Sequence, residues 1–353
     1  MTLRRTVQRV SGAGALLLGL ATLALPSPYM LEAPGPIFDT TGEVEDEPVT
    51  TVNGAETYET DGTLALTTIY VTGAPTQTVR VPQAVRGWVS STIDMTPHEL
   101  IYPTGTTAEE VREANTAAMA SSQELSLAAA LNHLDVDFEV DLFVVDFTPG
   151  ALEAGTDELL ISGDRVLEAA GEPVTGLEGL RSAVNEAAGE PIELTVARGG
   201  ESVNVEVPTY QEADGEYYVG IMLGNEFEFP VSAEIQLEDV GGPSAGLMFS
   251  LGLIDTMTEE SMTGSQHWAG TGTVDPDGTV GPIGGAPLKL VGAQDQGAEH
   301  FLAPRDNCDE LEGRLPSGLD VYGVENVDEA VTIVEAVRDG DEDFLAGVEP
   351  CGS

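Results

Sequence analysis

The amino-acid sequence predicts an α+β fold that begins with an apolar helix. Three observations support this prediction: an uncharged stretch from Val10 to Leu31, a helical pattern that opens at Thr107, and short strand-like segments separated by glycine-rich turns. The 353 residues are enough for two or three domains. We therefore expect several folding units with a substantial core.

The composition is strongly acidic. There are 61 acidic residues against 13 basic ones, and the formal net charge is −48. This charge repels polyanions, so we expect no binding to nucleic acid and no attachment of basic patches to an anionic membrane surface. Because 41% of the residues are apolar, the chain is not expected to be a disordered acidic protein. The acidity suits a surface in a saline or ion-rich setting.

The apolar stretch at the amino terminus is expected to span a membrane. A helix from Val10 to Leu31 would be about 33 Å long, which is enough to cross a bilayer. Three arginines precede it, and the positive end of a span stays inside. We therefore expect a single-pass protein of the cell membrane whose body, from Glu32 onward, is extracytoplasmic. The alternative is a cleaved secretory signal with an apolar core from Ala13 to Leu25.

The two cysteines of the chain, Cys308 and Cys351, are expected to form a disulfide. Cysteines of an exported chain commonly pair. This bridge would close a loop of about 44 residues, which is worth about 4 kcal/mol in the chain-entropy model. The alternative is two unpaired core residues. A metal site is not expected, because no His or Cys spacing typical of one accompanies them.

The first extracytoplasmic segments combine a connection, a strand and a helix. Residues 35–62 are rich in Gly, Pro, Thr and acidic residues, which indicates a solvated connection. Leu64 to Val71 is predicted to be a strand from its β-branched and apolar content. Thr107 opens the sequence TAEE, a pattern typical of a capping box at a helix start. We expect residues 32–135 to pack with the carboxyl-terminal domain.

Residues 136–209 change to short strands around one helix. The landmarks, in order, are Pro149-Gly150, Gly163-Asp164-Arg165-Val166-Leu167, Gly171-Glu172-Pro173-Val174 and Arg198-Gly199-Gly200. Their order resembles that of a bacterial PDZ domain. Such a module offers an open strand edge and an apolar groove beside a helix, where an extended peptide can add as a further strand. The alternative is a β-rich spacer without a ligand.

The stretch EDVGGPSAGLMFSLGLIDTM places Ser244 just before an apolar helical run. Gly241, Gly242 and Gly246 allow close approach of the backbone, and Pro243 fixes the chain where the helix begins. The backbone N–H groups at a helix start stabilise developing negative charge. This segment is therefore a candidate for both a hydroxyl nucleophile and part of an oxyanion hole.

Lys289, in the stretch GGAPLKLVG, is the only lysine of the chain. Burial can leave a lysine as a neutral amine that acts as a base, which arginine cannot do. The many carboxylates would raise the pKa of Lys289, whereas burial among neighbours such as Leu288 and Leu290 would lower it. We expect burial to dominate and the optimum of activity to be alkaline.

The order of GGPSAG, TGTV, GPIGG and the lysine four residues later resembles the proteolytic domain of Lon proteases. The resemblance extends roughly from Val231 to Asp339. Carried over by position, it implies that Ser244 is the nucleophile and Lys289 the general base. Thr271 matches a threonine that orients the lysine, and Gly242 with the Ser244 backbone matches the oxyanion environment.

As a whole, the chain resembles the membrane-anchored, PDZ-containing Lon-like serine proteases of Gram-positive bacteria. The expected order is an anchor or signal at 1–31, the extracytoplasmic region at 32–135, a PDZ-like domain at 136–209 and a Lon-type proteolytic domain at 210–353. The resemblance implies an ATP-independent endopeptidase that acts outside the membrane on peptides or membrane-exposed protein segments. It also implies a homo-oligomer.

Two other functions remain open from the sequence. One is a membrane-tethered PDZ scaffold that no longer cleaves, against which the retention of both Ser244 and Lys289 argues. The other is a Ser/His enzyme that uses His267 or His300, although neither histidine lies in a suitable motif. No GxxxxGK[ST] motif occurs, so a bound nucleotide has no support in the sequence. No cofactor is expected.

Overall fold

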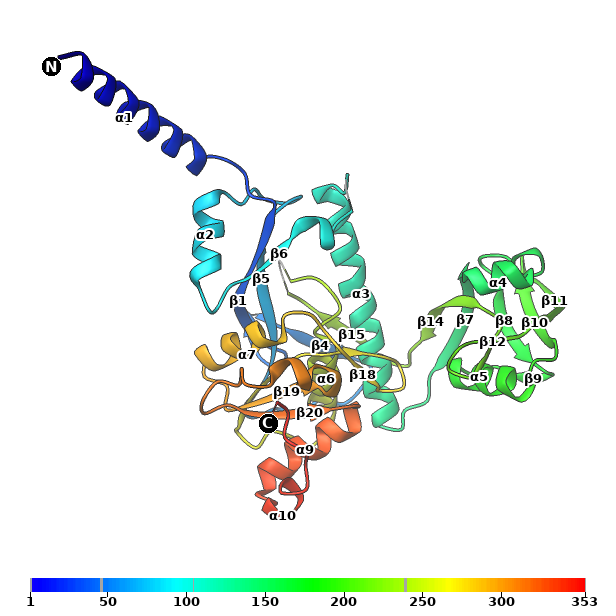
Figure 1. Ribbon diagram of the computed structural model, residues 1–353. Helices are drawn as coiled ribbons and strands as arrows, with labels where there is room; N and C mark the ends of the chain where they lie inside the picture. The colour runs from blue at the N-terminus through cyan, green and yellow to red at the C-terminus, as the bar shows by residue number, and fades with distance from the viewer. Residues whose placement is uncertain (1, 45–46, 104, 238–239, 353) are drawn as a thin grey trace. The chain divides into compact units, whose positions relative to one another are not determined.

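The computed structural model of the chain divides into two compact units (Figure 1). It describes residues 2–44, 47–103, 105–237 and 240–352. The first unit comprises residues 1–136 and 231–353, and the second comprises residues 137–230. The second unit is therefore an insertion in the sequence of the first. It extends past the predicted boundary at 209 because β14 (Ile221–Glu228) pairs with β7 (Glu139–Phe147).

The first unit is built on a six-stranded sheet with the order β20-β19-β16-β5-β1-β6. Its strands are β1 (Tyr29–Asp39), β5 (Thr63–Thr72), β6 (Asp94–Pro97), β16 (His267–Gly270), β19 (His300–Pro304) and β20 (Asp320–Val324). Strands β5, β16, β19 and β20 are parallel, and β1 is antiparallel to both β5 and β6. The strand predicted at Leu64 to Val71 is confirmed as β5. Since β5 pairs with β16, segments from both sides of the insertion share one sheet.

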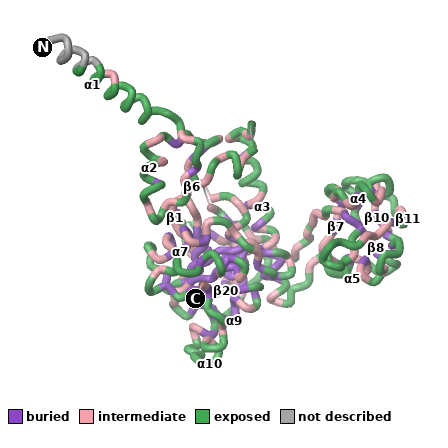
Figure 2. The backbone as a smooth tube through the Cα atoms, viewed as in Figure 1, coloured by how far each residue is buried: buried purple, intermediate pink, exposed green. Residues whose placement is uncertain are grey.

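Two helices, α6 (Gly246–Met257) and α7 (Ala286–Asp295), cover opposite faces of this sheet. Successive residues of a strand face opposite sides. On β16, Gly270 lies against Met248 of α6, whereas Ala269 packs in a cluster with residues of α7. The two helices therefore lie on opposite sides of β16. Figure 2 shows the buried residues concentrated in the interior of this unit.

Helix α3 (Ala108–His133) packs along α6. Its start is a capping box, as predicted: the Glu110 N–H donates to Thr107 Oγ1 at 3.2 Å, and the Thr107 N–H donates to the Glu110 carboxylate at 2.8 Å. Small buried residues on its second half allow α6 to come close. Among them, Ser126 Oγ donates to the Gly246 carbonyl at 3.0 Å.

The remaining elements complete the first unit. Its other helices are α1 (Thr2–Leu23), α2 (Val81–Val89), α8 (Cys308–Leu311), α9 (Val327–Asp339) and α10 (Glu342–Leu345). The short strand pairs are β2 (Glu43–Val44) with β3 (Glu47–Pro48), β4 (Thr50–Asn53) with β15 (Ser232–Ile235), and β17 (Thr273–Val274) with β18 (Val280–Gly281). The β4–β15 pair joins the chain before the insertion to the chain directly after it.

The prediction of an amino-terminal transmembrane helix is wrong. Helix α1 ends at Leu23, and the rest of the predicted span contains Pro26 and Pro28 and enters β1 at Tyr29. Proline ends the helix because it lacks an N–H donor and clashes with the preceding turn. In the described part of the chain, no helix combines the length and apolar character needed to cross a bilayer. The side chains of the three arginines near the amino terminus lie outside the described residues.

The second unit is a small β domain with the sheet order β11-β10-β8-β7-β14. Its further elements are α4 (Pro149–Ala154), β8 (Arg165–Ala169), β9 (Glu172–Pro173), α5 (Leu177–Glu186), β10 (Ile192–Arg198), β11 (Glu201–Val207), β12 (Tyr210–Gln211) and β13 (Tyr217–Tyr218). The Arg198 guanidinium holds the buried Asp164 carboxylate with bonds of 2.8 and 2.6 Å. Strand β14 stands at the edge of this sheet.

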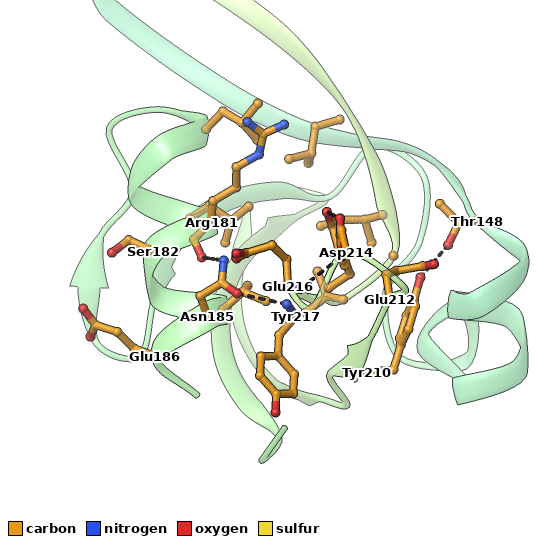
Figure 3. Close-up of a pocket in the computed structure, with 18 of the residues that line it drawn as sticks. Thr148, Arg181, Ser182, Asn185, Glu186, Tyr210, Glu212, Asp214, Glu216 and Tyr217 are labelled. Carbon is orange, nitrogen blue, oxygen red and sulfur yellow. Dashed lines mark hydrogen bonds between the residues drawn. The ribbon is translucent and has the colours of Figure 1, made fainter. Parts of the chain in front are cut away.

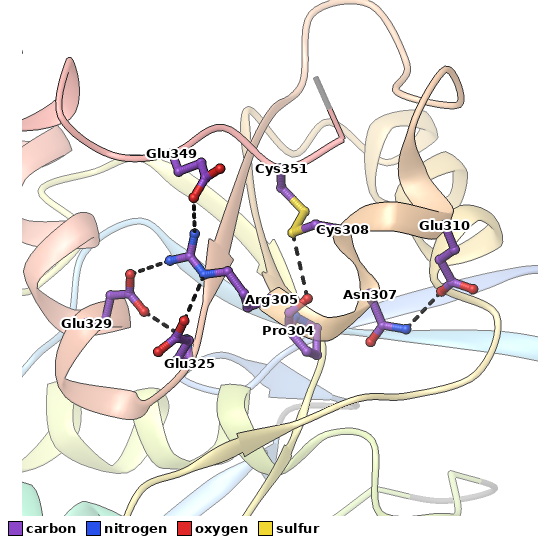
Figure 4. The surroundings of a disulfide bond; sticks show 9 residues. All are labelled: Pro304, Arg305, Asn307, Cys308, Glu310, Glu325, Glu329, Glu349 and Cys351. Carbon is purple, nitrogen blue, oxygen red and sulfur yellow. Dashed lines mark hydrogen bonds and ion pairs between the residues drawn. A yellow bond between two sulfur atoms is a disulfide. The ribbon is translucent and has the colours of Figure 1, made fainter.

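A disulfide between Cys308 and Cys351 attaches the carboxyl-terminal segment (Figure 4). Beside it, Arg305 forms ion pairs with Glu329 at 2.5 Å and with Glu349 at 3.9 Å. The Cys351 N–H also donates to the carbonyl of Val321 in β20 at 3.4 Å. The bridge and these contacts hold the segment against the sheet.

We predict that replacing both Cys308 and Cys351 by Ala lowers the free energy of unfolding by about 4 kcal/mol, since the bridge closes a long loop. Guanidinium denaturation followed by circular dichroism measures this change. Reduction of the wild-type protein should produce a similar loss, whereas reductant should not alter the double variant. A double variant as stable as the oxidised wild type would contradict the prediction.

Candidate active site

Lys289 and Ser244 are in direct contact in the first unit. The Lys289 Nζ lies 2.7 Å from Ser244 Oγ and 2.7 Å from Thr271 Oγ1. Lys289 is 2% exposed and Thr271 is fully buried, while Ser244 is partly exposed. The amine therefore lies behind a hydroxyl that a substrate can reach. The structure brings together three residues that the sequence predicts for one site.

The turn before α7 positions Lys289. Gly285 adopts φ 73° at the start of the helix, a left-handed conformation that favours glycine. A Cβ there would also lie 3.2 Å from the Ile69 side chain. The side chain of Asn307 binds both backbone groups of Ile283 at 2.9 Å. Since Asn307 precedes the disulfide-bonded Cys308, the tied carboxyl-terminal region also fixes the turn that leads to the lysine.

Thr271 follows β16 and determines the direction of the hydrogen bonds. Its hydroxyl donates to the Ser244 carbonyl at 2.9 Å, and the Gly272 N–H donates to the same carbonyl at 2.9 Å. With its proton used in this way, Thr271 Oγ1 accepts from the Lys289 amine. A neutral amine then keeps its lone pair for the hydroxyl proton of Ser244. This arrangement suits a base that takes up the proton of Ser244.

Burial lowers the pKa of Lys289 from 10.5 to about 7. Removal of the amine from water disfavours its charged form. This direction is the one that the sequence predicts, despite a net charge of −48. Near neutral pH a large share of the Lys289 amine is therefore neutral and able to accept a proton.

The loop before Ser244 is held by α3. The Gly242 N–H donates to the Asn115 carbonyl at 3.2 Å, and Ser122 Oγ donates to the Pro243 carbonyl at 3.3 Å. The sequence predicts Gly242 as part of the oxyanion environment, but its N–H is already engaged in the structure. Its φ of 94° instead makes it a bend that shapes the loop. Sequence reasoning missed Asn115 and Ser122 because no motif marks them.

The histidines have other partners. The His133 ring nitrogen lies 2.6 Å from Asp328, and His267 is 3.3 Å from the Thr63 hydroxyl. The His300 ring packs against Trp268 in a tilted arrangement with a centroid distance of 4.6 Å. The structure therefore offers no support for a Ser/His pair. Within the described residues, no group of three or more His, Cys, Asp or Glu could hold a metal.

A second candidate site is a groove in the second unit, with a volume of about 1340 Å³ (Figure 3). Helix α5 lines one side, and residues 210–223, which include the start of edge strand β14, line the other. The Asn185 side chain accepts from the Tyr217 N–H at 2.9 Å, and Tyr210 Oη lies 2.8 Å from Thr148 Oγ1. Its larger aliphatic residues are Leu177, Leu180, Val184, Val219, Ile221 and Leu223.

The charged residues that line this groove are mostly acidic. The carboxylates are Glu178, Glu186, Glu212, Asp214 and Glu216. The cation of the lining, Arg181, pairs with Glu178 at 3.2 Å. The groove therefore presents apolar surface with a negative rim, which favours a ligand that is apolar and positively charged.

Comparison with known proteins identifies a relative for part of the first unit. Residues 239–336 match the family model of the Lon protease (S16) C-terminal proteolytic domain. Lon protease 1 of Sorangium cellulosum is 36% identical over 93 residues, 26% of this chain and 11% of that protein. Lon protease of Roseiflexus castenholzii is 35% identical over 94 residues, again 26% of this chain and 11% of that protein. The predicted likeness to the Lon proteolytic domain is confirmed for this segment, which contains Ser244, Thr271 and Lys289.

A solved PDZ domain gives a much weaker likeness. The PDZ domain of an SdrC-like protein from Listeria monocytogenes is 14% identical, with 23% of this chain and 85% of that chain covered and a TM-score of 0.21. A TM-score this low does not establish a shared fold. The PDZ-like interpretation of residues 136–209 stays a prediction.

We predict that the side chain of Lys289 titrates with a midpoint of about 7 in the folded protein. Because Lys289 is the only lysine, lysine labelled with ¹³C at Cε gives one side-chain signal, and NMR reads its midpoint directly. The unfolded chain in urea should titrate near 10.4. The Ser244→Ala variant keeps the burial, so its midpoint should also stay well below that value. A folded midpoint equal to the unfolded one would refute the prediction.

Proposed function

We propose that this chain is a serine endopeptidase in which Ser244 is the nucleophile and Lys289 is the general base. The observation that carries the proposal is the 2.7 Å contact between the buried Lys289 amine and the Ser244 hydroxyl. Two findings support it: the pKa of Lys289 lowered to about 7, and the match of residues 239–336 to the Lon proteolytic domain.

The reaction begins with proton transfer inside the dyad. Neutral Lys289 takes the hydroxyl proton of Ser244 while the Oγ attacks the carbonyl carbon of the substrate peptide bond. As the tetrahedral intermediate collapses, the Lys289 ammonium gives its proton to the leaving amine, and an acyl-enzyme remains. Water then attacks the ester with Lys289 again as the base, and the proton returns to Ser244. Thr271 keeps the amine oriented through both steps.

We propose that this activity occurs outside the cytoplasm and requires no nucleotide. Structural disulfides persist in oxidising compartments, and Cys308 is bonded to Cys351. The sequence has no GxxxxGK[ST] motif. Burial alone lowers the pKa of Lys289, and this requires no bound nucleotide. Substrates would be peptides or accessible protein segments.

We further propose that the groove of the second unit binds an extended peptide that carries basic side chains. Edge strand β14 offers unpaired backbone groups to which a peptide can add as a strand. The apolar lining accepts its uncharged side chains, and the acidic rim attracts its lysines or arginines. Binding there would recruit substrates to the protease.

We predict that Ser244→Ala abolishes peptide hydrolysis and that Lys289→Arg lowers kcat/KM by 10²- to 10⁴-fold or more, since the contribution of a general base is of about this size. Cleavage of β-casein, with and without ATP, measures both. Ser232→Ala, an exposed serine of the same unit, is the control and should retain full activity. The wild-type kcat/KM should rise with pH through a midpoint of about 7, because only the neutral amine of Lys289 is a base.

The outcomes separate the alternatives. Equal cleavage by the wild type, Ser244→Ala and Lys289→Arg would refute the dyad. Failure of the wild-type protein to cleave would refute the endopeptidase proposal and favour the scaffold. A kcat/KM that stays flat between pH 5 and pH 9 would count against a titrating lysine.

For the groove, we predict that Leu177→Gln weakens binding of a lysine-containing extended peptide by roughly tenfold, because it removes apolar contact from the lining. Fluorescence anisotropy with the Ser244→Ala protein measures binding without cleavage. Leu152→Gln changes an exposed leucine of α4 outside the groove and should have no effect. The same peptide with glutamate in place of lysine should bind more weakly. Equal binding of the two peptides would contradict the charge preference.

A further inference from the structure

The peptide bond between Pro243 and Ser244 is fixed by a hydroxyl of α3. The Pro243 carbonyl accepts from Ser122 Oγ at 3.3 Å. This peptide bond is trans, so its C=O and N–H point in opposite directions. With the carbonyl turned toward α3, the Ser244 N–H points away from that helix.

The backbone groups next to the Ser244 N–H are not available to a substrate oxygen as donors. The Gly242 N–H donates to the Asn115 carbonyl, and Pro243 has no N–H. The Ser244 carbonyl accepts from both Thr271 and Gly272. The Ser244 N–H has no acceptor among the groups that the structure describes. It is therefore a donor of this loop that remains for a substrate, and it belongs to the same residue as the proposed nucleophile.

We propose that Ser122 is a positioning residue that keeps the Ser244 amide turned toward the substrate as the oxyanion donor. This inference rests on the proposed function. Ser122 is 2% exposed, so its hydroxyl has no easy access to solvent and needs a protein acceptor. If the peptide plane rotated by half a turn, the Pro243 carbonyl would face the substrate oxygen and repel it. Ser122 opposes this rotation by binding the carbonyl on the opposite side.

The contribution of Ser122 should be confined to the transition state. The substrate carbonyl is neutral in the ground state, and negative charge develops on its oxygen as Ser244 attacks. An interaction that strengthens only at that point raises kcat and leaves KM unchanged. Because Ser122 does not contact Lys289, its loss should leave the pH dependence in place.

The experiment compares Ser122→Ala with Ser126→Ala. Both serines are buried on α3, but Ser126 Oγ donates to the backbone carbonyls of Ser122 and Gly246 and not to the Pro243 carbonyl. We expect Ser122→Ala to lower kcat by roughly tenfold, a part of the 10²- to 10³-fold that a whole oxyanion donor supplies. The KM and the pH midpoint should not change. A peptide boronate, which mimics the tetrahedral intermediate, should lose affinity by the same factor. Ser126→Ala should keep the wild-type kcat.

A third variant keeps the test decisive if Ser122→Ala folds poorly. Ser122→Cys preserves the shape of the side chain but carries only a weak donor, so its kcat should also fall while its melting temperature stays near that of the wild type. Wild-type kcat in a folded Ser122 variant, an equal loss in Ser126→Ala, or a shifted pH midpoint would overturn the positioning role. If the wild-type protein itself fails to cleave, the proposed endopeptidase function is refuted. That result is distinct from a loss of the Ser122 role in an active enzyme.

Discussion

Burial of one amine without a counter-charge is the constraint on which the rest of the structure depends. A Lys289 pKa lowered from 10.5 to about 7 corresponds to a penalty of about 5 kcal/mol for the charged form in the folded protein. The unfolded chain binds the proton more tightly, so this penalty is largest below pH 7 and disappears as the pH rises past 10. The fold must supply it through apolar packing around α7 and the central sheet. The same burial that destabilises the ammonium makes the amine a base.

The site is assembled from segments that are far apart in the sequence, which explains the size of the scaffold. Strand β5, before the insertion, pairs with β16, after it, and β16 leads directly to Thr271. Helix α3 holds the loop of Ser244 through the Asn115 carbonyl and the Ser122 hydroxyl. The carboxyl-terminal disulfide adjoins Asn307, which grips Ile283 in the turn that leads to Lys289. Each of these contacts restrains a different one of Thr271, Ser244 and Lys289, so loss of any one should loosen the geometry of the proposed site and leave all three side chains in the chain.

The predictions made from the sequence agree with the structure where a function or a helix start requires particular residue types at a short, fixed spacing. Residue type and spacing are enough to predict three features: the single lysine after GPIGG, the serine after a Gly-Gly-Pro turn and the capping box at Thr107. The transmembrane prediction failed because apolar composition continues past Leu23 while Pro26 and Pro28 end the helix. The second unit extends past residue 209 because of the long-range pairing of β14 with β7. The contacts of Asn115 and Ser122 with the loop of Ser244 were likewise hidden, since they involve backbone groups of the loop that only tertiary packing brings to α3.

The acidity of the chain and a neutral lysine are compatible because they act over different distances. Surface carboxylates interact with Lys289 through solvent and salt, which screens charges beyond about 10 Å, whereas desolvation acts on the amine at contact range. Burial of the amine is accordingly what lowers the pKa of Lys289. A carboxylate placed next to Nζ would reverse this balance by stabilising the ammonium. The hydroxyls of Ser244 and Thr271 avoid that effect: they hydrogen-bond the amine without adding charge, so a chain with 61 acidic residues can still hold an amine able to accept a proton near neutral pH.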